Sequence, residues 1–261
     1  MKYDAGAGAY DRLTGRWSQL YAPAVLRAAG ASVGNAVLDL ATGTGDSALI
    51  AGRHVQAGGT VVGVDISVPM LRVANSKSLT SNVRFIAADA MMLPFRDGVF
   101  DAVICQFGLM FFPDRIAALT EIRRLLRPGG RVALTVWGPP DRAPFAGIMA
   151  RALGEELPAA RTELLLPFAL ANPQELHRLL EAAGFHDNRV NQETRLAHFE
   201  SVADFLEPYE QGGGRLGQAY LQLAPDARAA VRERVVAQLA TFPQGDRITM
   251  EIVAYLASGT A

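Results

Sequence analysis

The sequence predicts an α/β fold: a doubly wound, mostly parallel seven-stranded sheet with a helical cap. Over residues 36–137, short apolar runs alternate with helical patterns. These runs are apolar on both faces, which is typical of parallel strands covered by helices on both sides. Beyond residue 137, helical stretches are inserted between two last strand patterns. A length of 261 residues fits one large domain.

The first half of the chain supplies five predicted strands, at residues 37–40, 61–64, 83–87, 102–105 and 132–136. Helices are expected between them at about 46–55, from an N-cap at Ser67, and from an N-cap at Asp114 to Leu126. The Pro-Gly-Gly run at 128–130 is expected to end the last of these helices. Strands and helices thus alternate as a parallel sheet requires.

The second half supplies two more predicted strands, at 190–199 and 248–256. A helix is expected at 144–153, and another begins at Asn172 and ends at Gly184. Three further helices, at 202–209, 215–223 and 226–239, lie between the last two strands and form the predicted cap. The glycine run at 212–214 joins two of them and is interpreted as a hinge.

Composition and charge exclude several classes of function. The formal net charge is −1 and basic residues are not clustered, which argues against a nucleic-acid partner. Cys105 is the single cysteine, so no internal disulfide can form, and the four histidines lack metal-ligand spacing, so no metal is expected. The N-terminus has no signal-peptide pattern and the most apolar stretch, 99–112, is too short to span a bilayer. We therefore expect a cytoplasmic protein that acts on a small molecule.

The residues that carry chemistry lie at the end of the first predicted strand. Asp39 lies within the strand, and a turn containing Gly43 and Gly45 leads into a helix. Glycines let the backbone approach a ligand closely, and a helix N-terminus offers free N–H groups. Gly43-x-Gly45-x-x-Ala48 also fits a loose dinucleotide fingerprint, with Asp65 20 residues after Gly45. NAD(P) binding therefore stays open at this point.

Acidic residues at three successive strand ends favour another ligand. The carboxylate of Asp39 would repel a pyrophosphate but suits an ammonium or sulfonium group. Asp65 ends the second strand, in the position of a ribose-binding acid. Asp89 follows the third strand, where it could accept a hydrogen bond from an adenine amino group while the N–H of Ala90 serves the adjacent ring nitrogen. Together these groups fit a cationic amino-acid nucleoside.

Five motifs, in this order, resemble those of Rossmann-like (class I) S-adenosylmethionine (SAM)-dependent methyltransferases. They lie at residues 37–46, 62–65, 88–90, 100–104 and 126–131. The sequence is more similar to the branch that contains the ubiquinone and menaquinone C-methyltransferases. Residues 10–18 also resemble the N-terminal segment of many members, which closes over the cofactor. The turn departs from many relatives, which have glycine where this chain has Ala41.

The resemblance implies a division of the chain and a set of cofactor contacts. Residues 1–35 would form an N-terminal helical lid, 36–137 the SAM-binding core, and 138–261 the remaining strands with the substrate cap, all in one domain. Asp39 and the turn would hold the methionine portion, and Arg16 would reach its carboxylate. The implied cofactor-binding residues are Arg16, Asp39, Ala41, Gly43, Gly45, Asp65, Ile66, Met70, Asp89, Ala90 and Gln106.

Aromatic residues near the expected cofactor mouth are candidates for packing or for substrate contact. They are Tyr10, Trp17, Tyr21, Phe107, Phe111 and Trp137. No residue stands out as a general base or other catalytic group. This is compatible with in-line methyl transfer to an acceptor that is already nucleophilic, where positioning and exclusion of water supply the rate.

The sequence thus favours a SAM-dependent methyltransferase that acts on a small, largely apolar acceptor through a C, O or N nucleophile and releases S-adenosylhomocysteine (SAH). One alternative is an NAD(P)-dependent oxidoreductase, which Asp39 and the absence of a Tyr-x-x-x-Lys pair disfavour. The other alternative is a catalytically silent SAM-binding protein. An enclosed pocket reaching the cofactor's methyl group would favour an enzyme.

Overall fold

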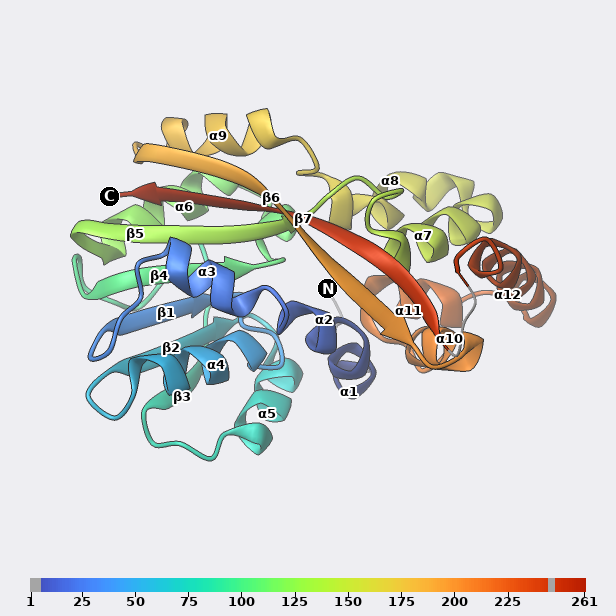
Figure 1. The fold of residues 1–261 in the computed structure, drawn as a ribbon, viewed down its shortest axis with the longest axis horizontal. Coiled ribbons are helices and arrows are strands. Elements are labelled where there is room, and N and C mark those ends of the chain that lie inside the picture. The colour runs from blue at the N-terminus through green and yellow to red at the C-terminus, as the bar shows by residue number, and fades with distance from the viewer. Residues whose placement is uncertain (1–5, 244–246) are drawn as a thin grey trace.

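A computed structural model describes residues 6–243 and 247–261 of the chain. The described residues form one seven-stranded sheet in the order β3-β2-β1-β4-β5-β7-β6 (Figure 1). The strands are β1 (Ala36–Leu40), β2 (Thr60–Asp65), β3 (Val83–Ala87), β4 (Phe100–Gln106), β5 (Leu126–Trp137), β6 (His186–Phe199) and β7 (Ile248–Thr260). Strands β1 to β5 pair in parallel, and β7 is antiparallel to both of its neighbours. The predicted doubly wound, mostly parallel sheet is confirmed.

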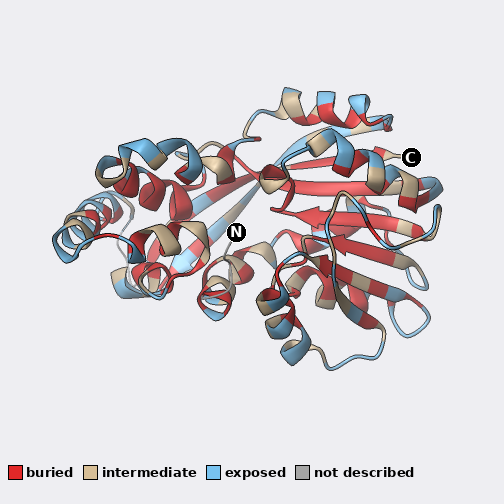
Figure 2. Ribbon diagram, turned by 180° about the vertical axis from the view of Figure 1, so that it is seen from behind, coloured by how far each residue is buried: buried red, intermediate tan, exposed pale blue. Residues whose placement is uncertain are grey.

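Helices cover both faces of the sheet (Figure 1). One face carries α3 (Ala22–Ala28), α4 (Asp46–Val55) and α5 (Val68–Lys77), and the other carries α6 (Arg115–Leu125) and α9 (Pro173–Ala182). Val37 and Leu38, neighbours in β1, are therefore both fully buried, each in a different hydrophobic cluster. Figure 2 shows the same pattern, with buried residues on the strands and on the inward sides of the helices.

Local sequence signals begin and end several helices as predicted. Each N-cap side chain accepts a hydrogen bond from the backbone N–H of the first turn. The caps are Ser67, Asp114 and Asn172, bonded to the nitrogens of Met70, Ala117 and Gln174 at 3.4, 2.9 and 3.0 Å. Gly184 follows the C-cap of α9 with a φ of +83°, the left-handed conformation that glycine adopts at little cost.

The start of β5 differs from the prediction. The helix α6 ends at Leu125, and β5 begins at once with Leu126, so the Pro-Gly-Gly run lies inside the strand. Leu126 pairs with Phe100 of β4, and the register then shifts before Arg131 pairs with Ala102. Residues 127–130 form this irregularity, with Gly129 at a φ of +79°. The run therefore interrupts a strand pairing as well as following a helix.

A cap lies beyond the carboxyl ends of the parallel strands (Figure 1). It consists of α7 (Pro144–Glu156) and α8 (Arg161–Leu164) from the β5–β6 connection, and α10 (Val202–Glu210), α11 (Gly214–Leu221) and α12 (Pro225–Leu239) from the β6–β7 connection. Short 3-10 turns occur at η2 (Leu109–Phe111), η3 (Pro158–Ala160) and η4 (Leu166–Phe168). The helical cap predicted between the last two strands is thus present.

The N-terminal segment lies between the sheet and the cap (Figure 1). It runs through α1 (Ala7–Tyr10), the π-helical turn η1 (Asp11–Gly15) and α2 (Arg16–Ser18), and contacts α5, α10 and α11. Residues 1–5 of the predicted lid, and residues 244–246, lie outside the described residues. No helix in the described parts of the chain combines the length and apolar character needed to cross a membrane.

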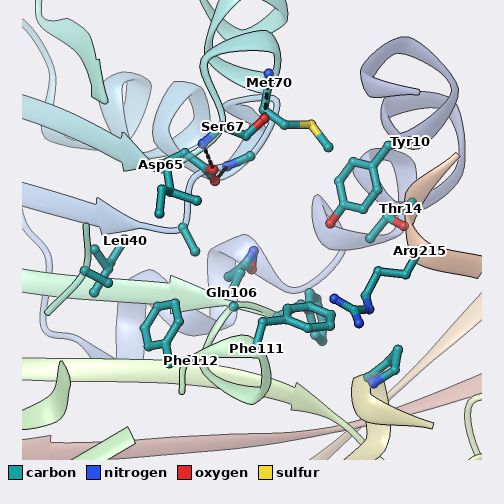
Figure 3. Close-up of a pocket in the computed structure, with 18 of the residues that line it drawn as sticks. Tyr10, Thr14, Leu40, Asp65, Ser67, Met70, Gln106, Phe111, Phe112 and Arg215 are labelled. Atoms are coloured by element: carbon teal, nitrogen blue, oxygen red, sulfur yellow. Dashed lines mark hydrogen bonds between the residues drawn. The ribbon is translucent and has the colours of Figure 1, made fainter. Parts of the chain in front are cut away.

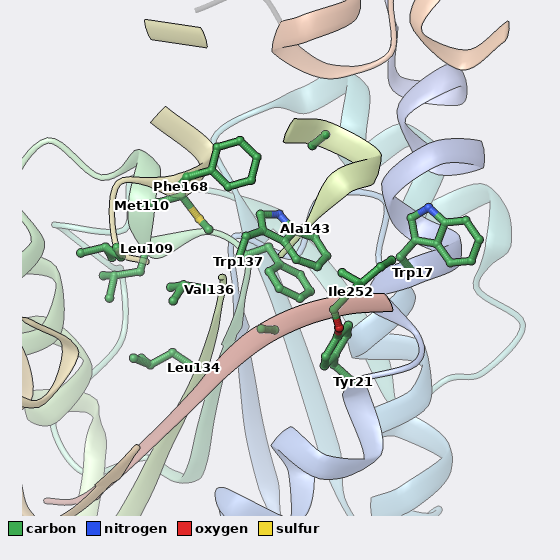
Figure 4. Packing of buried hydrophobic residues seen from close by; sticks show 14 of the residues in the cluster. Trp17, Tyr21, Leu109, Met110, Leu134, Val136, Trp137, Ala143, Phe168 and Ile252 are labelled. Atoms are coloured by element: carbon green, nitrogen blue, oxygen red, sulfur yellow. The ribbon is translucent and has the colours of Figure 1, made fainter. Parts of the chain in front are cut away.

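Aromatic side chains join the sheet to the cap (Figure 4). The rings of Phe107 and Trp137, at the ends of β4 and β5, stack with centroids 3.5 Å apart and an interplanar angle of 7°. Phe145 of α7 meets Trp137 edge-on at 4.8 Å. The buried hydroxyl of Tyr21 donates a 2.7 Å hydrogen bond to the carbonyl of Ile252 in β7. This cluster fixes the cap beside the strand ends.

Candidate active site

A cavity of about 580 Å³ opens at the carboxyl ends of the parallel strands, enclosed by the N-terminal segment and the cap (Figure 3). It lies between β1 and β4, where the strand order reverses: β2 and β3 follow on the far side of β1, and β5 follows on the far side of β4. This switch point is where open α/β sheets bind ligands. The volume falls in the range of small-molecule sites.

Two left-handed residues shape the floor of the cavity. Ala41 follows β1 with a φ of +56°, and Phe107 follows β4 with a φ of +53°. This conformation costs a non-glycine residue about 1–2 kcal/mol. The two turns also pack closely, because a Cβ added to Gly108 would lie 2.5 Å from the Cβ of Ala41. Ala41 thus keeps the conformation for which glycine is better suited.

The two glycines of the turn have different surroundings. Gly43, at a φ of +56°, lines the cavity opposite the ring of Tyr10. Gly45 is the N-cap of α4 and faces away from the cavity, because a Cβ there would lie 2.7 Å from Ala74 and 2.8 Å from Phe85. Gly45 therefore allows the helix to pack, whereas Gly43 exposes backbone to the cavity.

Asp65 ends β2 and organises the neighbouring backbone. Its Oδ2 accepts a 2.8 Å hydrogen bond from the N–H of Gly43, and its Oδ1 accepts a 2.9 Å bond from the N–H of Ser67. Burial raises the pKa of this carboxyl, although these bonds favour the charged form. A carboxylate has about four lone-pair positions, so each oxygen can accept a further hydrogen bond from a ligand hydroxyl.

A small polar pocket of about 30 Å³ adjoins the main cavity and contains Asp39. Asp39 is 1% exposed; its Oδ2 accepts a 2.6 Å hydrogen bond from Thr42, and burial raises its pKa to about 7. Gln106 lines both spaces, and its Nε2 donates to Ser47 at 2.7 Å and to the carbonyl of Ser18 at 3.2 Å.

Two buried acceptor atoms mark this pocket. Oε1 of Gln106 makes no hydrogen bond with the described residues, and Oδ1 of Asp39 makes none of normal geometry, although the N–H of Ala48 also favours the charged form of this carboxyl. A buried acceptor without a donor is costly, and an ionised one more so. An ammonium group, with three donors and a positive charge, has the chemistry that this pair of acceptors requires.

The far end of the cavity is formed by the connections after β2 and β3. Ile66, Met70, Asp89 and Ala90 all line it, as the sequence predicts for residues that share a site. Oδ1 of Asp89 accepts a 2.9 Å hydrogen bond from the N–H of Met91, which fixes the carboxylate at the cavity edge. Ile66 is 72% exposed, more than a buried core residue would be.

The other half of the cavity is largely apolar. Of the six expected aromatic residues, Tyr10, Phe107, Phe111 and Trp137 line the cavity. Sequence reasoning missed the lining residues that the cap contributes. These are Phe145, Ala146, Pro167, Tyr209, Gly213, Gly214, Arg215 and Leu216. Apart from Arg215 these residues are mostly apolar or small, which was visible in the sequence, but no local pattern indicated which helix faces meet the cavity.

Four expected site residues do not line the main cavity or the polar pocket. Besides Gly45, these are Arg16, Trp17 and Tyr21. Arg16 forms a 3.0 Å ion pair with Asp204 of α10, and its guanidinium lies 4.2 Å from the centroid of the Trp17 ring. Trp17 and Tyr21 are buried in the core. In the structure these residues make packing contacts and, at Arg16, a contact with the cap, and their roles toward a ligand stay predictions.

Comparisons with known proteins agree with this architecture. The model of the ubiE/COQ5 methyltransferase family matches residues 13–141. A demethylmenaquinone methyltransferase from Staphylococcus aureus is 33% identical over 201 residues, covering 71% of this chain and 83% of that protein. One from Thermus thermophilus is 47% identical over 111 residues, covering 42% of this chain and 50% of its own length, so that match spans half of the relative.

The same fold occurs in solved structures. The YcgJ protein from Bacillus subtilis superposes with a TM-score of 0.59. It is 21% identical, and the match covers 92% of this chain and 97% of that one. The likeness therefore extends through the sheet to the region beyond residue 141, where the family model no longer matches.

Proposed function

Because the chain belongs to the ubiE/COQ5 methyltransferase family, we propose that it transfers a methyl group from SAM to a small, largely apolar acceptor. One observation carries the proposal. A polar pocket with two unsatisfied acceptors lies beside a cavity that is acidic in one half and apolar in the other, at the carboxyl ends of the parallel strands. SAM, when bound, supplies an electrophilic methyl group on a sulfonium and leaves as SAH.

The residues present fit SAM along its length. Asp39 and Gln106 would accept hydrogen bonds from the ammonium group of its methionine portion, which supplies the donors that their buried oxygens lack. The Asp65 carboxylate would accept hydrogen bonds from the ribose hydroxyls, through the lone pairs that do not already accept from the N–H groups of Gly43 and Ser67. Asp89 would accept from the adenine amino group at the cavity edge.

The apolar half would hold the acceptor and exclude water. Among the described residues that line this half, none carries a carboxylate, and the hydroxyl of Tyr209 donates to the carbonyl of Phe145 at 2.6 Å. Burial raises the pKa of Tyr209 above its usual value, so this hydroxyl stays protonated at neutral pH and is not available to take a proton from the acceptor. We infer that the acceptor arrives already nucleophilic and that the aromatic walls position it. The relatives are named for demethylmenaquinone, which makes that quinone, in its reduced form, the first acceptor to test.

Calorimetric titration of the full chain with SAH, SAM and NAD⁺ tests cofactor choice. We expect one site per chain for SAH and SAM and no binding of NAD⁺. Asp65→Asn should weaken SAH binding on the order of 10- to 100-fold, because hydrogen bonds to a charged group are lost. The exposed Asp141→Asn is the matched control and should leave affinity unchanged. Binding of NAD⁺ without SAH would reverse the assignment in favour of an oxidoreductase.

Turnover distinguishes an enzyme from a silent binding protein. SAH release is measured with SAM and a panel of reduced quinones, phenols and amines. Release that depends on one acceptor supports the methyltransferase, and the NMR spectrum of the product gives the methylated atom. SAH binding with no release from any acceptor class would support the silent alternative.

A further inference from the structure

The strand β6 forms one edge of the sheet (Figure 1). Among the described residues, β7 supplies its single strand neighbour. It runs for 14 residues, whereas strands commonly have about 5–6. Asn191, Gln192 and Thr194 are exposed, which leaves the middle of the strand accessible. Natural proteins either shield such an edge or use it for association.

The backbone of β6 points alternately toward β7 and toward the free edge. In the ladder between β5 and β7, the N–H of Gly138 donates to the carbonyl of Val253 at 2.9 Å, so Val253 points toward β5. The next residue, Ala254, therefore points toward β6, where it lies opposite Glu193. Because Glu193 points inward, the alternate residues direct their N–H and C=O groups to the free edge. Between positions 188 and 196 these are Asn188, Val190, Gln192, Thr194 and Leu196.

The charges of β6 are arranged symmetrically about Asn191. Arg189 and Glu193 lie two positions before and after it, and Asp187 and Arg195 lie four positions before and after it. A twofold axis through Asn191 would pair two antiparallel copies of this strand. Each acid would then lie opposite a base of the second copy, and opposite charges in that arrangement stabilise a pair of strands.

Neighbouring registers lack this match. An antiparallel pair joins residues that both point to the edge, so the axis passes through a residue and not between two. An axis at position 190 places Asp187 opposite Glu193, and an axis at position 192 places Arg189 opposite Arg195. Axes at positions 189 and 193 place a charge opposite its own copy. Like charges directly opposite each other are destabilising.

The two ends of the strand exclude the remaining registers. The carbonyl of His198 accepts a hydrogen bond from Arg16 of α2, which covers the edge there and excludes an axis at position 194 or beyond. At the other end, the register with β7 shifts between His186 and Arg189, and Asp187 has a φ of +51°. The regular part of the free edge lies between these ends, so the pair of Arg189 and Glu193 carries the match.

Both groups of this central pair can reach a second copy. Arg189 is exposed, and the side chain of Glu193 is 25% exposed. Glu193 forms a 2.8 Å ion pair with Arg195 of its own strand, but a carboxylate has about four lone-pair positions and can accept from a second guanidinium. In a pair of residues that is not hydrogen-bonded, the Cα atoms lie about 4.5 Å apart, which brings the side chains together.

We propose that β6 pairs with β6 of a second copy of this chain about a twofold axis through Asn191, so that the two sheets join into one. Val190 of each copy exchanges backbone hydrogen bonds with Gln192 of the other. Such an interface uses the same patch on both copies and therefore closes as a dimer. None of the residues 188–194 lines the cavity, so the inference goes beyond the proposed function and does not depend on it.

Sedimentation velocity of the full chain, at concentrations from about 1 to 100 μM, tests the proposal. We expect a monomer–dimer equilibrium in this range. Arg189→Glu places like charges opposite each other on both sides of the axis and should weaken dimerisation at least about 10-fold. Arg84→Glu, at an exposed position of β3 on the opposite edge of the sheet, is the matched control and should leave dimerisation unchanged.

Exchange of charges identifies the interacting residues. Glu193→Arg alone should also weaken self-association, but a mixture of this variant with Arg189→Glu should form a heterodimer, because each acid then meets a base. The double variant Arg189→Glu/Glu193→Arg should dimerise again. A wild type that stays monomeric, a dimer that Arg189→Glu does not weaken, or a mixture that does not associate would overturn the proposal.

A backbone variant covers the case in which the charge changes disturb folding. Gln192→Pro removes an N–H that points to the free edge, a position in which an edge strand tolerates proline. The variant should be monomeric, with the circular dichroism spectrum and the SAH affinity of the wild type. A Gln192→Pro variant that keeps both the fold and the dimer would also overturn the proposal. Failure of the wild type to bind SAH would defeat the proposed function and leave this inference standing.

Discussion

The backbone N–H of Gly43 donates a 2.8 Å hydrogen bond to Oδ2 of Asp65, which ties the turn after β1 to the end of β2. The other oxygen of the same carboxylate accepts from the N–H of Ser67, the N-cap of α5. One acidic side chain thus fixes two backbone segments that border the cavity. Removal of the whole side chain would free both segments, whereas the isosteric Asn variant keeps one acceptor oxygen and gives up one of the two backbone bonds, so it disturbs the frame less.

Asp39→Asn should stabilise the chain at alkaline pH. Burial raises the pKa of Asp39 to about 7 in the folded chain, above its unfolded value of about 4. The folded state therefore binds this proton more tightly, and stability falls as pH rises from about 4 to 7. Urea unfolding at pH 8 should give the variant a free energy of unfolding that exceeds that of the wild type by on the order of 1–4 kcal/mol. This gap between the two free energies should narrow at pH 5. A gap of the same size at both pH values would contradict this account, and Asp141→Asn should show no gap.

The affinity for SAM should depend on pH through the protonation of Asp39. Above pH 7 the Asp39 carboxylate is charged and attracts an ammonium group, whereas below pH 7 the free protein holds it protonated. Calorimetry should therefore show SAM binding strengthening between pH 6 and pH 8. Asp39→Asn should bind SAM more weakly at pH 8 and lose most of this pH dependence. An unchanged profile in the variant would show that another group causes it.

Gly45→Ala should destabilise the fold more than Gly34→Ala. Both glycines have a φ of +85°, so each substitution carries the strain of a left-handed alanine, about 1–2 kcal/mol. Only at Gly45 would the new Cβ collide with Ala74 and Phe85, since nothing lies within 4 Å of the corresponding position at Gly34. Overpacking adds about 1–3 kcal/mol. Equal free energies of unfolding for the two variants would refute the packing role of Gly45.

Tyr21→Phe should affect stability but not ligand binding. The variant loses the buried hydrogen bond to the carbonyl of Ile252, which costs about 1–2 kcal/mol in unfolding free energy. Its affinity for SAH and its rate of methyl transfer should stay within about 2-fold of the wild type, because Tyr21 does not line the cavity. A selective loss of turnover would support the substrate contact predicted from the sequence.

Lys77→Met should loosen the N-terminal segment. The Lys77 ammonium contacts Asp11 of η1 at 2.7 Å and Asp46 of α4 at 2.9 Å, so its loss leaves two neighbouring carboxylates without their shared cation. Amide hydrogen exchange of residues 7–18 should become several-fold faster, while the central strands stay protected. Arg72→Met, on the exposed side of the same helix, is the control. Unchanged exchange would show that apolar packing alone holds the segment.

The sheet and much of the cofactor half could be predicted from the sequence because their signals are local. Apolar runs give the strands, and acids at the ends of parallel strands come together at one edge, as Asp65 and Asp89 do. The position of Arg16 could not be predicted in this way. Its partner Asp204 lies 188 positions later, and only the folded cap brings the two together.

The apolar half of the cavity was predictable only in outline. An apolar surplus beyond Trp137 indicated a wall, but Arg215 and Tyr209 reach the cavity through the packing of α10 and α11 against α7 and the N-terminal segment. The start of β5 shows a similar limit. A Pro-Gly-Gly run disfavours a helix through local geometry alone. Its place inside a strand depends on the pairing of Leu126 with Phe100, which lies 26 residues earlier in the chain.

The helices α10 to α12 leave and rejoin the sheet through facing residues of one antiparallel ladder, Phe199 of β6 and Ile248 of β7. Everything between these two positions is, in topological terms, an enlarged hairpin loop. A change in the length of this loop would leave the pairing of Phe199 with Ile248 in place. Under the proposed function, the helices that would contact the acceptor can therefore vary while Asp65, at the end of β2, keeps its place.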